Sequence, residues 1–470
     1  MLAKKQQGYT IDMTNGPLMK KMLFFAVPLA LSTLLQLLFN AADLVVVSRF
    51  AGDNAMAAVG ANTSLINLLV KTLTSVSVGA NVLAARERGA GERAEIRRTA
   101  HTAMTMSLVG GLLLLIVGLL GADWLMQWMK IPENIQAQAG LYLKIYFLGM
   151  PATLIYNFGS ALLRSVGDTR RPLYFLTLSG VVNVCLNLVL VVVFHLDVAG
   201  VAIATVVSQI LSAALVVRCL LLDEGDIRLE LRKLRIHLDK LLEILRIGLP
   251  AGIQASIFSL SNVLIQSSIN SFGEVVIAGD AAASTIQGFV HCIDTALCST
   301  VLSFIGQNMG AKKMKRVPRV LLIAMVYQAA ASALLVVAFA FCGEALLGIY
   351  TQTPEVIAVG IQEFSVMVNF YVLCGAMNIM GSAMRGLGYS LTSMIVSLIG
   401  VCGFRVVWVA TVFQLPQYHT YRSLLISYPI SWTATALIHL GCWCYAIRKV
   451  RRQQEKENSA AQERSARSCL

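Results

Sequence analysis

Residues 102–121 read TAMTMSLVGGLLLLIVGLLG, a run of twenty residues without a charged side chain. An α-helix rises about 1.5 Å per residue, so this run is long enough to cross the ~30 Å hydrocarbon core of a bilayer. Similar stretches recur along the whole chain. Of its 470 residues, 57% are hydrophobic and 13% are charged, whereas a soluble domain is about a quarter charged. These values exclude a soluble enzyme, a secreted disulfide scaffold and a disordered protein.

The hydropathy pattern predicts an all-α membrane protein with twelve transmembrane helices. The expected spans are 22–47, 55–80, 99–121, 136–162, 172–194, 199–222, 244–268, 276–303, 318–342, 358–383, 390–413 and 424–447. We therefore expect four parts: a six-helix N-terminal lobe over 1–222, a cytoplasmic interfacial linker over 223–243, a six-helix C-terminal lobe over 244–447, and a disordered cytoplasmic tail over 448–470. The linker alternates leucines with basic residues, and the tail is polar and charged.

The positions of the basic residues predict the orientation. Lys and Arg number 38 against 25 Asp and Glu, for a net charge of +13. With the twelve spans in place, 32 of the 38 fall on one side of the membrane, counting Arg218, Arg246 and Arg319 just inside the ends of their spans, and three fall on the other side. This asymmetry predicts that both termini lie in the cytoplasm of a multi-pass protein of the cytoplasmic membrane. Anionic membrane lipids account for the basic surplus, so no nucleic-acid partner is expected.

The two halves of the sequence match at a shift of about 221 residues. Pro28 pairs with Pro250, and the Arg-Ser-Val-Gly sequence at 164–167 pairs with Arg-Gly-Leu-Gly at 385–388. Gly89-Ala90 likewise pairs with Gly310-Ala311, and Pro132-Glu133 with Pro354-Glu355. A six-span repeat has the same topology in both copies. It therefore predicts two lobes related by a pseudo-twofold axis along the membrane normal.

Several short motifs recur in a characteristic order. They are Asn40-Ala41-Ala42-Asp43, Ala57-Ala58-Val59-Gly60, Gly79-Ala80-Asn81, Leu163 to Thr169 (LRSVGDT), Gly306-Gln307-Asn308 and Arg385-Gly386-Leu387-Gly388. In order, spacing and duplication the chain resembles the multidrug and toxic compound extrusion (MATE) family over residues 20–447. The resemblance implies a secondary transporter rather than an enzyme. Such a transporter exports cationic or amphipathic compounds in antiport with protons or sodium ions by alternating access of its two lobes.

The resemblance also implies an ion-coupling cluster in the N-terminal lobe. In the family an acid at the position of Asp43 binds the coupling ion, together with side chains on spans 5 and 6. Here these positions hold Asn183, Asn187 and Thr205. Asn187 is neutral where the family often has an acid, so Asp43 is the one carboxylate of the predicted cluster. One carboxylate can bind a proton, or a sodium ion whose other ligands are neutral oxygens.

A second group of ionisable residues lies in spans 2 and 8. His291 and Asp294 are three positions apart and share a helix face. Lys71 maps by the repeat shift to about residue 292, at a depth similar to that of Asp294. In the family fold, spans 2 and 8 face each other across the cleft. We therefore hypothesise an ion pair between Lys71 and Asp294 in one state of the transport cycle; the alternative is that each contacts its own lobe alone.

Three further polar residues lie in spans of the two lobes. Arg405 in span 11 is expected to pair with Asp294 or Glu363, or else to contact an anionic substrate. Asn157 and Asn378 precede the two repeated arginines and are expected to line the cavities of the lobes, although asparagine in a membrane often only bonds a neighbouring helix.

The rival function is a flippase for a lipid-linked saccharide or another anionic amphiphile. The wider superfamily contains such flippases, and Lys71, His291 and Arg405 give the spans a basic character. No GxxxxGK[ST] loop and no CxxC pair are present, so no cofactor beyond a coupling H⁺ or Na⁺ is expected. The expected partners are small-molecule substrates and membrane lipids, and the protein is expected to act as a monomer.

Overall fold

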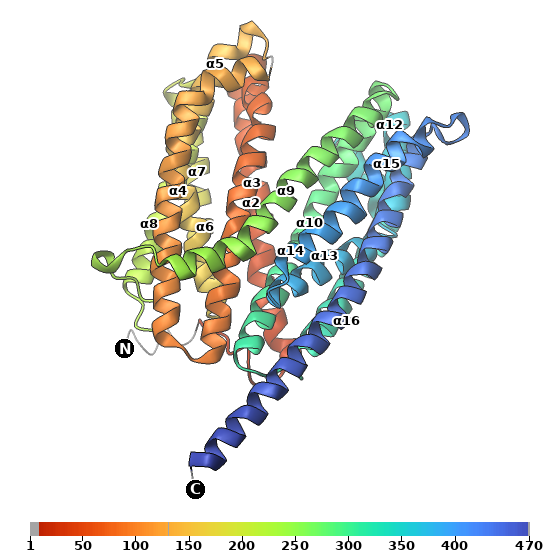
Figure 1. Cartoon of the computed structure of the whole chain (residues 1–470). Helices are drawn as coiled ribbons and strands as arrows, with labels where there is room; N and C mark the ends of the chain where they lie inside the picture. Colours follow the sequence, from red (N-terminus) through yellow and green to blue (C-terminus); the bar gives the residue numbers. More distant parts are fainter. Residues whose placement is uncertain (1–8, 130, 469–470) are drawn as a thin grey trace. The chain divides into compact units, whose positions relative to one another are not determined.

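The computed structural model describes residues 9–129 and 131–468, and the regular secondary structure of this part of the chain is entirely helical, without a β-strand. Figure 1 shows the helices in chain order. Those of the first half are α2 (Leu18–Phe50), α3 (Asp53–Ala90), α4 (Arg93–Trp128), α5 (Glu133–Leu148), α6 (Met150–Ser165), α7 (Arg170–Asn187), the π-helical segment η1 (Leu188–Val193) and α8 (Asp197–Leu221).

The second half repeats this order after a short 3₁₀ turn, η2 (Leu231–Lys233). Its elements are α9 (Leu238–Asn270), α10 (Glu274–Gly310), α11 (Val317–Gly348), α12 (Pro354–Met367), α13 (Tyr371–Gly386), α14 (Ser390–Ser397), the π-helical segment η3 (Leu398–Gly403), α15 (Phe404–Ala410), the 3₁₀ turns η4 (Val412–Gln414) and η5 (Pro416–Tyr418), and α16 (Tyr421–Ser468).

Within the described residues, ten segments are long and apolar enough to cross a membrane. Two more spans consist of bent helix pairs, α5 with α6 and α12 with α13, which bend by 45° and 51°. The first bend lies at Gly149, two residues before Pro151, and proline lacks the N–H needed to continue the preceding helix. The predicted all-α class with twelve spans, six in each half, is therefore confirmed.

The chain divides into two compact units, and the division differs from the predicted boundaries. Unit 1 is built mainly from Leu23–Arg88 and Glu92–Ser256, and unit 2 mainly from Ile257 onward, with Met13–Met22 and Gly89–Gly91 added to it. The linker at 223–243 is therefore part of unit 1, and the division falls inside α9 rather than at residue 244. Hydropathy shows where a span begins, but it does not show which helices that span packs against.

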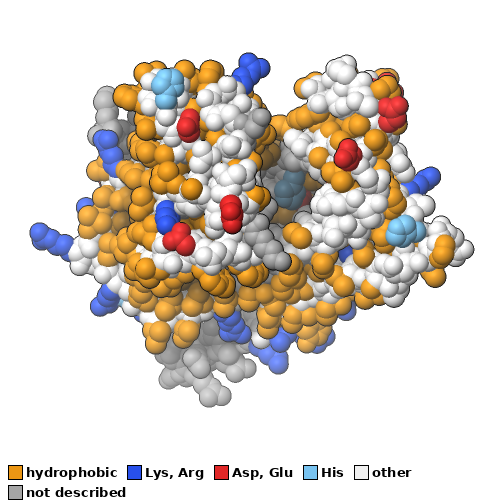
Figure 2. Space-filling view, turned by 90° about the horizontal axis from the view of Figure 1, so that it is seen from above, with side chains coloured by type: hydrophobic (Ala, Val, Ile, Leu, Met, Phe, Trp, Pro, Cys, Tyr) orange, Lys and Arg blue, Asp and Glu red, His pale blue; other side chains and the backbone are white. Residues whose placement is uncertain are grey.

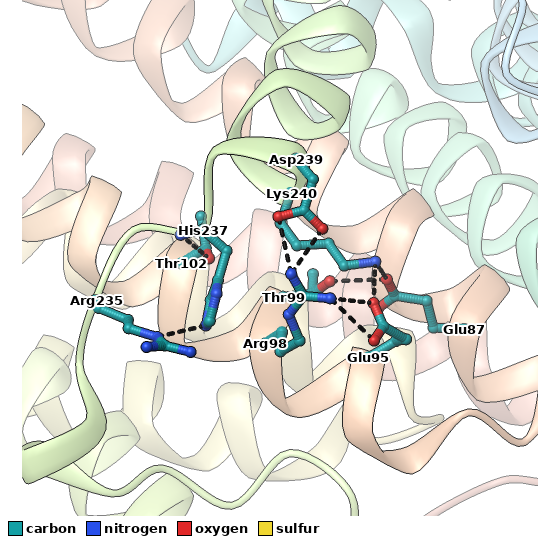
Figure 3. A network of polar contacts seen from close by, with 9 residues as sticks. All are labelled: Glu87, Glu95, Arg98, Thr99, Thr102, Arg235, His237, Asp239 and Lys240. Carbon is teal, nitrogen blue, oxygen red and sulfur yellow. Dashed lines mark hydrogen bonds and ion pairs between the residues drawn. The ribbon is translucent and has the colours of Figure 1, made fainter.

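Ionic contacts fasten the start of α9 to α3 and α4 within unit 1 (Figure 3). The buried Lys240 Nζ lies 2.7 Å from Glu87 Oε1 and 2.7 Å from Glu95 Oε2. Arg98 bridges Glu95 and Asp239, with its Nη2 2.9 Å from Asp239 Oδ2. This network ties a charged segment of the predicted linker to the same unit as the first six spans.

Just beyond this network, glycine residues permit a close approach of α3 and α9. A Cβ atom at Gly79 of α3 would collide with the carbonyl oxygen of Ile244 in α9. A Cβ atom at Gly248 of α9 would likewise collide with the carbonyl oxygen of Val76. The backbones therefore meet directly, as small residues allow at helix interfaces in membranes.

The expected disordered tail is instead helical as far as the structure describes it. α16 continues without interruption from Tyr421 to Ser468, and residues 469–470 lie outside the described residues. The tail is rich in Gln, Glu, Arg and Ala, which are strong helix formers, and it extends a helix that the last span has already nucleated. Polar composition indicated that this segment lacks a core, but it did not exclude a helix.

Large apolar side chains are exposed in both units. Leu120 of α4 is 82% exposed, and Phe341 of α11 is 85% exposed. Figure 2 shows hydrophobic side chains over much of the surface that this view presents. Exposed apolar surface on this scale is unfavourable in water, and lipid is the solvent that suits it.

Candidate functional site

The carboxylate of Asp43 on α2 lies against the end of α7 in unit 1. Asn187, the last residue of α7, is completely buried, and its side-chain amide donates a hydrogen bond to Asp43 Oδ1 across 144 positions of sequence. The same amide nitrogen lies 3.4 Å from Asn183 Oδ1. The structure therefore brings together three of the four residues predicted for ion coupling.

The local helix geometry at this cluster is unusual. The π-helical segment η1 begins directly after Asn187, and π-helical turns occur frequently at functional sites. Asn187 Oδ1 is buried and has no hydrogen-bond partner in the part of the chain described. A carboxylate, an unpartnered amide oxygen and the oxygen of Asn183 thus lie close together, and oxygens of these types are ligands for hard cations.

Thr205, the fourth predicted residue, bonds its own helix instead. Its hydroxyl donates to the carbonyl oxygen of Val201 at 2.9 Å. Sequence reasoning missed Tyr146, which interacts electrostatically with Asp43. It also missed Gln209 on α8, whose side-chain oxygen Oε1 is buried without a hydrogen-bond partner in the described structure. Gln209 stands one helical turn after Thr205 in an apolar span, and that spacing was the signal that could have identified it.

Unit 2 contains a second carboxylate that accepts a hydrogen bond from an asparagine. Asp294 on α10 is 1% exposed and accepts a hydrogen bond of 2.7 Å from the side-chain amide of Asn378 on α13. His291 Nδ1 lies 3.6 Å from Asp294 Oδ2 and 3.5 Å from the hydroxyl of Tyr371. The structure thus brings three predicted cavity residues into one cluster. It combines a buried carboxylate with an imidazole that can carry a proton.

A pair of buried acids in unit 2 was not predicted as a site. Asp280 and Glu363 are 5% and 2% exposed, and the Tyr421 hydroxyl lies 3.0 Å from an oxygen of each. Gln287 donates to the other oxygen of Glu363 at 2.7 Å. A phenol has one proton to donate, so it can donate to only one of the two acids. A hydrogen bond between Tyr421 and each of the two acids therefore requires a proton on one of the two carboxyl groups.

Arg405 does not form the expected ion pair with Asp294 or Glu363. Its guanidinium carbon lies 3.9 Å from the centre of the Tyr428 ring and 6.0 Å from that of Trp432. Its Nε donates to the hydroxyl of Ser431 at 3.2 Å. The faces of aromatic rings attract a cation electrostatically. Two aromatic rings therefore lie where the sequence predicted a carboxylate partner for Arg405.

The two remaining predicted residues take part in no site within their own unit. Asn157 donates to the carbonyl oxygen of Thr153 in its own helix at 2.8 Å, so it bonds its own turn rather than the neighbouring helix that the alternative named. Lys71 is exposed on α3. It belongs to unit 1 and Asp294 to unit 2, so their pairing stays a prediction.

Comparison with known proteins matches both halves of the chain. The family model described as MatE matches residues 28–189 and again residues 250–411. The two matches cover more than half of the chain and coincide with the two copies of the repeat.

Curated relatives span nearly the whole chain. A protein named "Probable multidrug resistance protein YoeA" from Bacillus subtilis (strain 168) is 25% identical over 439 residues, which is 92% of this chain and 94% of the relative. A protein named "FAD transporter" from Shewanella oneidensis is 22% identical and covers 92% of this chain and 95% of its own length.

Solved structures share the fold. One is described as "Reverse polarity of binding pocket suggests different function of a MOP superfamily transporter from Pyrococcus furiosus Vc1 (DSM3638)"; it has a TM-score of 0.88 at 20% identity and covers 94% of this chain and 99% of its own. Another, described as the outward-facing conformation of a multidrug resistance MATE family transporter, has a TM-score of 0.86 at 20% identity, with the same coverage of both chains.

Proposed function

Because this chain belongs to the MatE family of multi-pass membrane transporters and is not an enzyme, we propose that it exports cationic or amphipathic organic compounds in antiport with protons or sodium ions. The coupling ion binds at Asp43 in unit 1. The protein works in the cytoplasmic membrane with both termini in the cytoplasm, since the basic residues concentrate on that side of the predicted spans. It acts as a monomer.

The observation that carries this proposal is the contact between Asp43 and Asn187. An ionised carboxylate in a membrane span is unfavourable unless it is paired, hydrated or neutralised. The described contacts of Asp43 supply amide and phenol groups and no cationic side chain. A proton or a sodium ion would complete the site.

The same contact suggests how ion binding changes the lobe. An ionised Asp43 only accepts hydrogen bonds, and here it accepts one from the Asn187 amide nitrogen. A protonated Asp43 donates a hydrogen bond, and the unpartnered Oδ1 of Asn187 is an acceptor within the same side chain. Rotation of one amide group therefore separates the two states. Export follows if the coupling ion and the substrate prefer different states.

The names of the relatives support organic substrates. One is named a probable multidrug resistance protein and another an FAD transporter, so the names of both relatives refer to organic molecules. The rival flippase has no such support among these relatives.

Transport by the reconstituted full-length chain tests the proposal. Proteoliposomes are loaded with ethidium, and its movement is measured under a proton gradient or a sodium gradient, each imposed alone. One of the two gradients should drive transport, and Asp43→Asn should reduce the driven rate about tenfold or more, because the carboxylate cannot be replaced by a neutral amide.

Asp123→Asn provides the matched control. Asp123 is also an acid of unit 1, but its side chain is 72% exposed and pairs with Lys144 at 2.8 Å. This variant should keep the native rate. If neither gradient drives transport, or if both variants lose the same amount, the proposed coupling site is refuted.

A further inference from the structure

Arg405 of unit 2 carries a buried positive charge that has no negative partner among the described residues. It is 5% exposed, and its described contacts are the Ser431 hydroxyl and two aromatic rings. Lys240 is a useful comparison, because it is 7% exposed and contacts two carboxylates. A buried charge is normally compensated by an opposite charge. In the described part of unit 2 that compensation is missing at Arg405.

The aromatic contacts and the Ser431 contact leave the two Nη groups of the Arg405 guanidinium available to donate hydrogen bonds. A cation–π contact uses the face of the guanidinium plane, whereas its N–H groups donate within the plane. Tyr428 covers the face, and Ser431 occupies Nε. The two Nη atoms have no hydrogen-bond partner among the described residues. Paired Nη groups in one plane match the two oxygens of a carboxylate or a phosphate.

A second unpartnered donor stands on the same side of this helix. Trp408 follows Arg405 by three positions, so the two residues share a face of α15. Its indole Nε1 is buried and has no hydrogen-bond partner in the described structure. An indole nitrogen can only donate, so it too requires an acceptor.

The surroundings are aromatic and locally irregular. Phe404 and Trp408 pack with tilted rings at 5.8 Å between ring centres, and Tyr428 and Trp432 meet edge to face at 5.8 Å. The π-helical segment η3 ends immediately before α15. The other π-helical segment, η1, follows Asn187 in the fifth span of unit 1, which corresponds to the eleventh span in the repeat. Irregular turns of this kind are frequent at functional sites.

We propose that Arg405 and Trp408 form an anion subsite for substrate, which takes the carboxylate or phosphate of an aromatic organic anion. The guanidinium Nη atoms and the indole N–H donate to the oxyanion, and the surrounding rings pack against the aromatic part of the substrate. This proposal rests on the proposed export function and adds aromatic organic anions to the amphipathic compounds proposed there as substrates. Of the alternatives that the sequence left open for Arg405, the proposal selects contact with an anionic substrate over pairing with an acidic side chain.

Flavin mononucleotide and riboflavin are a suitable pair of probes, because they share one ring system and differ by a phosphate group. Equilibrium binding of each to the full-length protein is measured by fluorescence anisotropy in nanodiscs of phosphatidylcholine. The native protein should bind flavin mononucleotide about tenfold or more tightly than riboflavin, as expected for charge-assisted hydrogen bonds. Arg405→Gln should bring this ratio close to one by weakening the binding of flavin mononucleotide about tenfold, with a much smaller change in riboflavin binding.

Two further variants separate the subsite from a general effect on folding. Trp408→Phe keeps an aromatic ring and removes the N–H, and it should lower the ratio several-fold. Arg422→Gln changes an exposed arginine of unit 2 and should keep the native ratio. Riboflavin binding reports on the fold of every variant. Equal affinity of the native protein for both flavins, or an unchanged ratio in Arg405→Gln, would overturn the proposal.

A lipid headgroup is the other source of a phosphate. In nanodiscs that contain phosphatidylglycerol, the preference for flavin mononucleotide should persist. Its complete loss there would assign the subsite to lipid and overturn the substrate role. Because binding is measured without any ion gradient, these results do not depend on whether Asp43 couples transport. Conversely, ethidium transport by Arg405→Gln tests coupling without the anion subsite.

Discussion

Lys240→Met tests whether the start of α9 is an integral part of unit 1. Methionine keeps an unbranched apolar side chain in the same space and removes the charge. The Lys240 and Glu87 side chains are only 8% and 6% exposed, and they meet at 2.7 Å. Removal of one partner of a buried pair leaves an uncompensated charge and destabilises a protein by about 3–5 kcal/mol.

The expected value lies at the lower end of that range. Glu87 keeps its hydrogen bond of 2.9 Å from Thr99, and Glu95, the second partner, is 31% exposed and keeps Arg98. We therefore expect a loss of about 3 kcal/mol, which is roughly a hundredfold change in the unfolding equilibrium. Addition of Glu87→Gln to Lys240→Met should recover more than half of this loss, because the buried charge is then removed as well.

The assay is reversible unfolding of the full chain in mixed micelles, followed by circular dichroism. Lys233→Met is the control, because Lys233 also pairs with a glutamate at 2.8 Å, but its side chain is 69% exposed and that of Glu230 is 36% exposed. An exposed pair contributes about 0–1 kcal/mol. Equal losses in the two lysine variants, or no recovery in the double variant, would refute the reasoning.

Two further variants test other buried polar groups. Tyr421→Phe removes the hydroxyl that two buried acids share, and it should lower the free energy of unfolding by about 1–3 kcal/mol; Tyr418→Phe, at a tyrosine that is 48% exposed, should change it little, and equal effects would contradict the assigned role. Burial raises the pKa of the Asp223 carboxyl in the segment that joins the two halves, so the folded state binds this proton more tightly than the unfolded state does. The resulting stability is present at low pH and is lost as the pH rises through the folded-state pKa. Asp223→Asn should therefore be more stable, relative to the native protein, at pH 7 than at pH 4, and a difference that is the same at both pH values would count against this sign.

Sequence reasoning predicted the architecture because the membrane imposes simple constraints. A charge-free run such as residues 102–121 must be a helix when lipid surrounds it, since no other open structure satisfies its backbone hydrogen bonds. The repeat, in which Pro28 aligns with Pro250, predicted two halves of six spans each, because equivalent sequence segments form equivalent spans. The helical period also predicts that Asn183 and Asn187 lie on one face of a helix.

Contacts between helices distant in the sequence could not be predicted in this way. Arg405 illustrates this, because its charge predicted a carboxylate partner, whereas the packing of α15 and α16 gave it two aromatic rings. Asp280, Glu363 and Tyr421 come from three helices, and no periodicity within one helix connects them.

The sequence by itself therefore determined which segments cross the membrane and which ionisable residues lie within them. Only the tertiary structure decided that Asn187 bonds Asp43, that α9 begins in unit 1, and that Arg405 contacts aromatic rings instead of an acid among the residues described. Hydropathy and helical period are properties of a single segment and its solvent. The partner of a buried polar group depends on the rotation and packing of neighbouring helices, which small differences in side-chain shape determine.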